Sequence, residues 1–268
     1  MKILFIGDIV GHRGRQCVAR LLPELRAEHG LDLVVANAEN AAGGLGATPS
    51  VIAELYHVGV QGVTLGNHVW RKKELAGSLN GLDYVVRPAN YPEGVPGKGS
   101  VILTLSDGRR VGLVNLAGRV FMEPCACPFE KGRRTVDALR ETTQIVLVDF
   151  HAEATSEKVA FGWHMDGSCT AVFGTHTHVQ TADERVLPNG TAYMTDVGMT
   201  GPIDSVIGVE RDRAIRKFLT GMPSEFKVAK GRGSLCVAIV EADDETGRAL
   251  SIQRVARLDY GPDQDAED

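Results

Sequence analysis

The chain opens with Lys2-Ile3-Leu4-Phe5-Ile6-Gly7, followed directly by Asp8, and this stretch sets the pattern of the first half. A short and almost wholly apolar run is expected of a strand that is buried on both faces. Similar runs at 33–36 and 62–65 predict two further strands. Amphipathic spacing between and after these runs predicts helices at 16–29, 50–58 and 72–79. This alternation of strands and helices predicts an α/β fold with helices covering a sheet.

The second half contains pairs of apolar runs joined by turn residues. We expect hairpins between 100–105 and 110–116, between 184–187 and 191–194, and between 234–241 and 250–258. Single strands at 144–150 and 171–173 and a helix at 156–163 complete the pattern. The prediction is one domain over residues 1–268, with two mixed β-sheets flanked by helices. The acidic and polar residues 261–268 are expected to form a disordered tail.

Composition limits the partners that the chain is expected to bind. Its 268 residues carry a formal net charge of −5 at pH 7, which argues against the basic surface that coats extended nucleic acid. No window approaches the run of about 20 apolar residues that a membrane helix needs. We therefore expect neither a membrane nor extended nucleic acid as a partner.

Cysteine usage points to a reducing compartment. The chain has five cysteines, an odd number without the spacing of a disulfide framework. No secretory signal is visible, because Asp8 breaks the apolar start within a few residues. We expect a cytoplasmic protein, and the sequence leaves open whether it forms a homo-oligomer.

Polar residues with metal-binding side chains follow five of the predicted strands. The carboxyl ends of strands form the rim of the ligand crevice in α/β sheets, so these side chains are expected to meet there. Each one alone has an ordinary structural explanation, such as helix capping, and their number favours a functional site. The residues are Asp8, Glu39, Asn40, Asn67, His68, His151, His176 and His178.

The last two of these lie in Gly174-Thr175-His176-Thr177-His178. In an extended segment, side chains two residues apart project to the same side, so the two imidazoles can hold one metal ion or two adjacent ones. Exposed loop histidines without a function are the alternative for such a pair taken alone.

The chemistry of the set indicates a metal centre. Carboxylate, carboxamide oxygen and imidazole without cysteine suit Fe, Mn or Zn. Six or more ligands are too many for one catalytic ion that keeps an open position, and they suit two. Two ions about 3.5–4 Å apart can hold a hydroxide and stabilise both oxygens of a phosphoryl transfer.

Four motifs resemble, in order, those of the calcineurin-like metallophosphoesterases: Gly7-Asp8, Gly66-Asn67-His68, Phe150-His151 and Gly174 to His178. Within that superfamily the chain is most similar to the YmdB-type group, reported as 2′,3′-cyclic-nucleotide phosphodiesterases. The finer similarity lies in residues 5–11, 38–44, 174–183 and 191–199. The resemblance implies the metallophosphoesterase-type sandwich of two mixed sheets.

Two departures from the superfamily pattern concern the ligands. Val10 stands where most members have a histidine, and Ala38-Glu39-Asn40 stands where most have Gly-Asp. The resemblance then implies that Glu39 bridges two ions and that Asn40 replaces the missing histidine. It implies that site one comprises Asp8, Glu39, Asn40 and His178, and that site two comprises Glu39, Asn67, His151 and His176. It places His68 at the leaving-group oxygen, with a role in orienting Asn67 as the alternative.

The resemblance implies a dinuclear phosphodiesterase for small cyclic nucleotides. Its cofactors are expected to be two divalent or trivalent transition-metal ions, Fe or Mn in preference to Zn, with a bridging hydroxide as nucleophile. A phosphomonoesterase or nuclease with the same centre is one alternative. A regulatory metal- and nucleotide-binding protein with little turnover is another.

Overall fold

The computed structural model describes residues 1–262, so most of the tail expected at 261–268 lies outside the described residues. The helices are α1 (Gly11–His29), α2 (Pro49–His57), α3 (Lys73–Ser78), the short 3₁₀ helix η1 (Leu79–Gly81), α4 (Pro128–Arg140), α5 (Thr155–Met165) and α6 (Arg211–Thr220). The strands are β1 (Lys2–Ile6), β2 (Leu33–Asn37), β3 (Gly62–Thr64), β4 (Val85–Val86), β5 (Ser100–Thr104), β6 (Arg110–Ala117), β7 (Ile145–His151), β8 (Ala171–Thr175), β9 (Arg185–Val186), β10 (Ala192–Met194), β11 (Gly201–Pro202), β12 (Gly233–Ala242) and β13 (Ala249–Asp259).

The strands form two mixed sheets, as the sequence predicts. In the first, β1 to β4 run parallel in chain order, and β12 pairs antiparallel with β1, β11 and β13. In the second, the order is β5-β6-β7-β8-β10-β9, with β6, β7, β8 and β10 parallel. All three predicted hairpins are present as antiparallel pairs.

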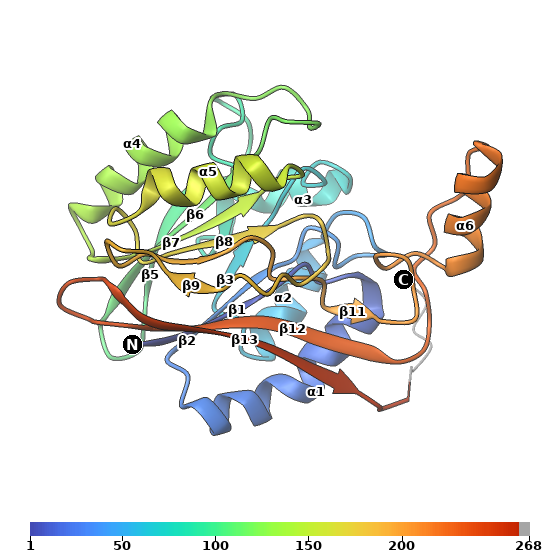
Figure 1. The fold of residues 1–268 in the computed structure, drawn as a ribbon, viewed down its shortest axis with the longest axis horizontal. Coiled ribbons are helices and arrows are strands. Elements are labelled where there is room, and N and C mark those ends of the chain that lie inside the picture. The colour runs from blue at the N-terminus through green and yellow to red at the C-terminus, as the bar shows by residue number, and fades with distance from the viewer. Residues whose placement is uncertain (263–268) are drawn as a thin grey trace.

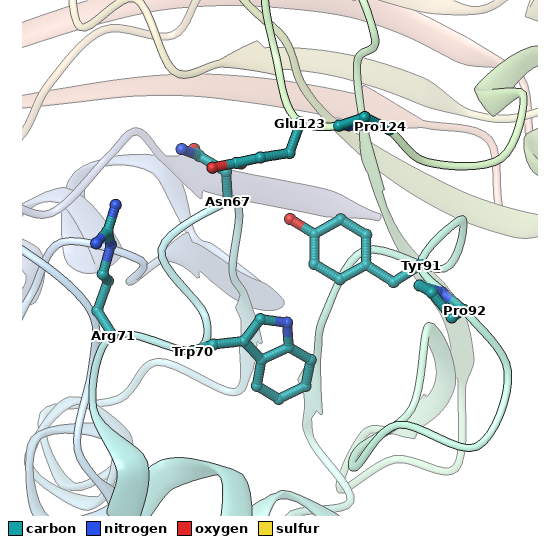
Figure 2. A pocket seen from close by; sticks show the side chains of 7 residues that line it. All are labelled: Asn67, Trp70, Arg71, Tyr91, Pro92, Glu123 and Pro124. Atoms are coloured by element: carbon teal, nitrogen blue, oxygen red, sulfur yellow. The ribbon is translucent and has the colours of Figure 1, made fainter.

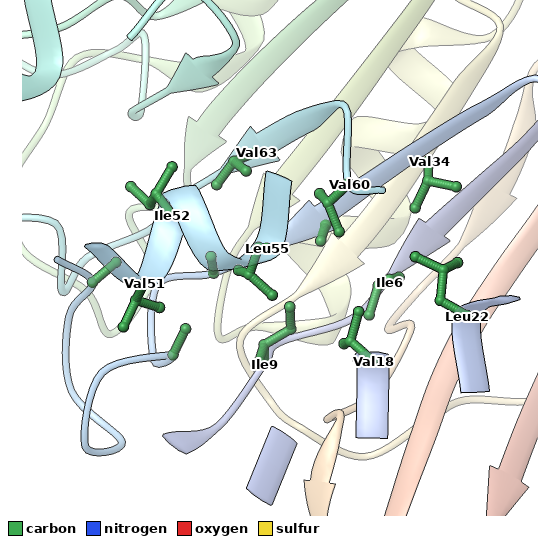
Figure 3. Packing of buried hydrophobic residues seen from close by; sticks show 14 of the residues in the cluster. Ile6, Ile9, Val18, Leu22, Val34, Val51, Ile52, Leu55, Val60 and Val63 are labelled. Carbon is green, nitrogen blue, oxygen red and sulfur yellow. The ribbon is translucent and has the colours of Figure 1, made fainter. Parts of the chain in front are cut away.

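The two sheets pack face to face, with helices on their outer faces (Figure 1). Alternate residues of β1 explain this layering, since strand side chains point to opposite faces. Leu4 and Ile6 pack in the cluster that includes α1 and α2, whereas Ile3 and Phe5 pack between the sheets. Figure 3 shows Ile6 beside Val18 of α1. Phe5 stacks on Phe173 of β8 with ring centroids 4.5 Å apart, which joins the two sheets at their centre.

A third apolar layer lies between the second sheet and the helices α4 and α5. Phe150 of β7 stacks on Phe161 of α5 at 4.3 Å, and Val136 of α4 is buried in the same cluster. The result is a four-layer sandwich that confirms the expected fold class. Within residues 1–262, no helix has the length and apolar character needed to cross a membrane.

The structure corrects the boundary of the first helix. It begins at Gly11, five residues before the predicted start, so His12 and Arg13 are helical. The residue before the helix is Val10, which offers no capping side chain, and Gly11 has a φ of 58°. A helix that begins without a polar cap lacks the usual sequence signal.

The sequence analysis also missed α4 and the two-residue strands β4 and β11. For α4 a signal was present, because Pro128 occupies the first turn and Phe129, Val136 and Leu139 are spaced for one helical face. The two short strands carry too few residues for any periodicity to be recognised.

Candidate metal centre

All eight predicted site residues lie where strands of both sheets end. Asp8 follows β1, Glu39 and Asn40 follow β2, and the remaining residues come from β3 onward. Asn67 and His68 follow β3, His151 is the last residue of β7, and His176 and His178 follow β8. The parallel direction of these strands brings their carboxyl ends to one rim, which is why residues far apart in sequence meet.

The four residues expected for site two converge closely. His151 Nε2 lies 3.2 Å from Glu39 Oε2, 2.9 Å from Asn67 Oδ1 and 3.1 Å from His176 Nδ1. Ligand atoms of Glu39, His151 and His176 all lie within 4.8 Å of one another, which is the spacing of a group able to hold one ion.

The other three residues expected for site one, besides Glu39, lie close to one another. His178 Nε2 is 3.9 Å from Asp8 Oδ1 and 3.3 Å from Asn40 Nδ2. Asn40 Nδ2 donates to Glu39 Oε1 at 2.9 Å. Glu39 Oε2 therefore lies beside the His151 ring, and Glu39 Oε1 is hydrogen-bonded to Asn40, so the carboxylate contacts one residue from each expected site.

The Asn40 amide is oriented away from metal ligation. Its Oδ1 accepts from His68 Nδ1 at 2.7 Å, and its Nδ2 faces Glu39 and His178. Ligation through Oδ1 would need the amide rotated by 180°, an exchange of two groups of nearly equal size.

Each of the three expected histidine ligands has its other ring nitrogen held by a hydrogen-bonding group. His151 Nδ1 lies 2.9 Å from Thr175 Oγ1, and His178 Nδ1 lies 2.9 Å from the Ile207 carbonyl oxygen. His176 Nε2 lies 3.1 Å from Glu153 Oε2. Such partners fix the tautomer and orientation of metal-binding imidazoles.

A buried chain of side chains behind His151 was not predicted from the sequence. Asp149 Oδ1 accepts from the Thr175 hydroxyl at 2.6 Å, and Asn37 Nδ2 donates to Asp149 Oδ2 at 2.9 Å. Burial raises the pKa of Asp149 to about 6, against the lowering effect of His151 and the Thr175 hydroxyl. The alternation Asp149, then His151, on one strand was the available signal, since both side chains share one face of β7.

The segment that carries His176 and His178 is a tight turn, which corrects the expectation of an extended segment. β8 ends at Thr175, and His176 and His178 have φ values of 95° and 66°. Residues other than glycine rarely adopt a positive φ, and those that do cluster at functional sites. His176 Nδ1 lies beside His151, whereas His178 Nε2 lies nearer Asp8 and Asn40.

A buried ion pair holds this turn in place. Asp196 Oδ2 accepts from the Thr177 amide and hydroxyl at 3.1 and 2.6 Å and from Lys158 Nζ at 2.7 Å. Both Asp196 and Lys158 are buried, so water does not reach either charge and each depends on the other as its partner. The charge of Lys158 thus satisfies the carboxylate that fixes Thr177.

The carboxylates and imidazoles of the centre shift one another's pKa values. Burial alone would lower the pKa of His151, but the carboxylates of Glu39 and Asp8 raise it to about 9. Burial and the neighbouring charge of His151 lower the pKa of His176 to about 3. Burial also raises the pKa of Asp8, whereas His151 and His68 hold that of Glu39 well below its usual range despite burial.

Two local features fit a metal ion at this position. Asp8 Oδ1 is buried without a hydrogen-bond partner among the described residues, although a carboxylate oxygen in the interior normally has one. Gly66 makes room for the centre, because a Cβ there would lie 2.2 Å from Glu39 Oε2 and 2.5 Å from His151 Nε2. The donor set and the space around it are therefore suited to cations held by Glu39 and its neighbours.

His68 faces a cavity of about 250 Å³ over the centre. The rim of this cavity includes Gly44 and Leu45, from the glycine-rich loop, together with Ile207 and Phe226. Gly43, Gly44 and Gly46 have φ values of 62°, 82° and 84°, a conformation that glycine adopts readily.

Arg13 lies five residues after Asp8 in the sequence, but its side chain points away from the metal centre toward β13. Its guanidinium is buried and donates to Asp259 Oδ2 at 2.7 Å and to the Gly231 carbonyl oxygen at 2.7 Å. Arg13 therefore connects α1 to β13 and takes no part in the metal centre.

Comparison with known proteins supports the reading of these motifs. Residues 4–255 match the model of the family described as YmdB-like protein. The chain is 45% identical over 255 residues to a 2′,3′-cyclic-nucleotide 2′-phosphodiesterase of Bacillus subtilis, with 95% of this chain and 96% of that protein covered.

Solved structures agree over the same length. A hypothetical protein from Thermus thermophilus has a TM-score of 0.87 at 43% identity, covering 96% of this chain and 99% of that one. A structure described as a novel phosphatase from Mycoplasma pneumoniae has a TM-score of 0.90 at 36% identity, covering 98% of this chain and 95% of that one. With the family model matching nearly the whole chain, this protein belongs to the YmdB-like family.

Proposed function

We propose that this protein is a metal-dependent phosphodiesterase that opens 2′,3′-cyclic nucleotides to nucleoside monophosphates. The observation that carries the proposal is the position of Glu39, whose carboxylate lies beside His151 of one expected site and Asn40 of the other. The similarity to the Bacillus subtilis phosphodiesterase over 95% of the chain supports the choice of substrate.

Two transition-metal ions, Fe or Mn in preference to Zn, would lower the pKa of water and neutralise charge on the phosphoryl oxygens. Asp8, Glu39, Asn40 and His178 would hold one of them. Glu39, Asn67, His151 and His176 would hold the other. The neutral state that imidazole needs for ligation is favoured at His176, whose pKa is low because of burial and the charge on His151.

His68 is proposed to protonate the leaving oxygen. Its Nδ1 lies 3.1 Å from Glu39 Oε1, so that nitrogen carries a proton directed at the carboxylate. Nε2 is then the nitrogen that delivers a proton. Water adds to phosphorus, one ribose P–O bond breaks, and the departing alkoxide takes the proton from His68.

The carboxylate of Glu39 contacts both the ring and the main chain of His68. Its Oε2 also accepts from the backbone N–H of His68 at 3.1 Å, which fixes the main chain at this residue. The orientation of the proposed acid therefore depends on the same carboxylate that is proposed to bridge the ions.

The experiment is a comparison of kcat/KM for 2′,3′-cyclic AMP and for nitrophenyl phosphate, with the same metal and buffer. We expect the cyclic diester to be preferred, and we expect a chelator to abolish both reactions until Mn²⁺ or Fe²⁺ is restored. A monoester preferred by tenfold or more would replace this function with a phosphomonoesterase. Binding without turnover in every metal state would leave a regulatory protein.

A further inference from the structure

A second cavity adjoins the metal centre. It measures about 440 Å³ and meets the centre at Asn67, which lines it and whose Oδ1 lies 2.9 Å from His151 Nε2. Figure 2 shows the side chains that line it, which come from three separate segments: 67–71, 91–92 and 123–124. The catalytic chemistry proposed above makes no use of this space.

Two aromatic rings form one wall of the cavity. Trp70 and Tyr91 have ring centroids 6.4 Å apart with planes inclined by 35° (Figure 2). Trp70 is 37% exposed, although a tryptophan with a purely structural role is normally well covered. It follows His68 by two residues, in the same turn that presents His68 and Asn67.

The backbone that presents Tyr91 is held rigidly. The side chain of the preceding residue, Asn90, accepts from the Ala117 amide at 2.9 Å and donates to the Ala117 carbonyl oxygen at 2.7 Å. These bonds fix the loop to the end of β6. Tyr91 is therefore positioned before any ligand arrives, which lowers the entropic cost of binding to it.

Charged groups of both signs lie around the aromatic wall. Arg71 and Glu123 line the same cavity, and they offer hydrogen-bond donors and acceptors. Burial raises the pKa of Tyr91, and the carboxylates of Glu123 and Glu39 raise it further. An aromatic face with both donors and acceptors at its edge suits a flat, polar heterocycle.

We infer that this cavity binds the nucleobase of the substrate, which stacks on Trp70 and Tyr91 while the cyclic phosphate lies between Asn67 and His68. The inference rests on the proposed function and adds the part of the substrate that the metal centre does not contact. Every base has a π-face, so stacking would hold nucleotides that carry different bases with similar strength.

The test compares two cyclic phosphates that differ only in the base. One is 2′,3′-cyclic AMP, and the other is the 2′,3′-cyclic phosphate of methyl ribofuranoside. For Trp70→Leu we expect the ratio of their kcat/KM values to fall by about tenfold, in line with the usual strength of base–aromatic stacking. The loss should lie mainly in KM, and Trp70→Phe should recover most of it.

The chain offers a matched control and a second readout. It has two tryptophans, and Trp163 is 50% exposed on α5, where Arg185 stacks over its ring. Trp163→Leu should leave the ratio unchanged. In that variant Trp70 is the one remaining tryptophan, so adenosine 3′-monophosphate should quench its fluorescence in the metal-loaded protein, whereas ribose 3-phosphate should not.

The outcomes separate this inference from the function on which it rests. An unchanged ratio in Trp70→Leu, whether neither or both of the substrates lose activity, would overturn the base subsite while leaving the phosphodiesterase activity intact. Quenching of Trp70 by adenosine 3′-monophosphate without turnover of any cyclic phosphate would support the subsite and overturn the proposed activity.

Discussion

Glu39 is the residue that we propose to bridge the two metal ions. Its oxygens face His151 on one side and Asn40 on the other, at 3.2 and 2.9 Å. We predict that Glu39→Gln loses at least one metal ion and several orders of magnitude in turnover, because an amide bridges poorly and leaves the cationic charge uncompensated. Elemental analysis and kinetics check this, with the exposed Glu130→Gln as a control. Near-normal activity with two ions bound would show that Glu39 is not a bridge.

His68 should affect chemistry rather than metal content. We expect His68→Ala to retain both ions and to lower kcat by roughly 10²–10⁴-fold, the usual range for general acid catalysis. The deficit should shrink on a nitrophenyl diester, whose leaving group hardly needs a proton. Equal deficits on both substrates, or metal loss, would instead assign His68 an orienting role toward Asn67.

Asp149 and Thr175 are expected to act through His151. The Thr175 hydroxyl donates to Asp149 and lies 2.9 Å from His151 Nδ1, so its loss removes the group that orients this imidazole. We predict that Asp149→Asn and Thr175→Val each lower metal affinity by about 10–100-fold, the range seen for such supporting residues. The metal affinity of the double variant should be little lower than that of either single variant, since both residues belong to the same series of hydrogen bonds. Additive losses in metal titrations would contradict this linkage.

At the scale of secondary-structure elements, the turn after β3 has to approach the centre closely. Gly66 begins this turn, and any side chain there would collide with Glu39 and His151. We expect Gly66→Ala to abolish metal binding at site two while the protein stays folded, as judged by circular dichroism.

The matched control for this turn is Gly77 in α3, where a Cβ would meet no atom within 4 Å. Gly77→Ala should keep both ions and raise the free energy of unfolding by up to about 1 kcal/mol, because alanine favours the helix. Equal metal content in the two variants would mean that the turn can shift to accommodate a side chain.

At the scale of the whole molecule, the buried pair of Arg13 and Asp259 joins the two ends of the chain. Their 2.7 Å contact connects α1 to the end of β13. We predict that Asp259→Asn lowers the free energy of unfolding by about 3–5 kcal/mol, the usual effect of removing one partner of a buried pair. The exposed pair of Asp204 and Arg232 is the control, and Asp204→Asn should cost less than about 1 kcal/mol. Urea unfolding measures both.

The contribution of Asp259 should depend on pH with a definite sign. Burial would raise its pKa, but the Gly261 amide and the charges of Arg13 and Arg20 outweigh burial and lower it below the usual 3.8. A carboxyl group whose pKa is lower in the folded than in the unfolded protein stabilises the fold at pH values above its unfolded-state pKa. This stabilisation is lost as the pH falls through the folded-state pKa. The advantage of the wild type over Asp259→Asn should therefore be constant at neutral pH and shrink in acid. An advantage that grows in acid would contradict the assignment.

Local sequence determined the layers of the sandwich and the positions of the polar residues at its rim. Strand side chains alternate, so apolar runs such as Lys2–Ile6 specify buried strands, and the residue after each run identifies the rim. For the same reason Asp8, Glu39 and His151 could be assigned to one site before their distances were known. The start of α1 escaped this reasoning, since Val10 provides no polar cap.

The tertiary structure alone decided which atoms meet within that rim. The left-handed turn at His176 and His178, the hydrogen-bonded chain from Asp149 to His151 and the contact of Arg13 with Asp259 join segments by long-range packing. The aromatic wall of Trp70 and Tyr91 likewise joins two loops that belong to no common motif. Sequence periodicity reports which face of an element is buried, whereas the partner across that face depends on how all the elements pack together.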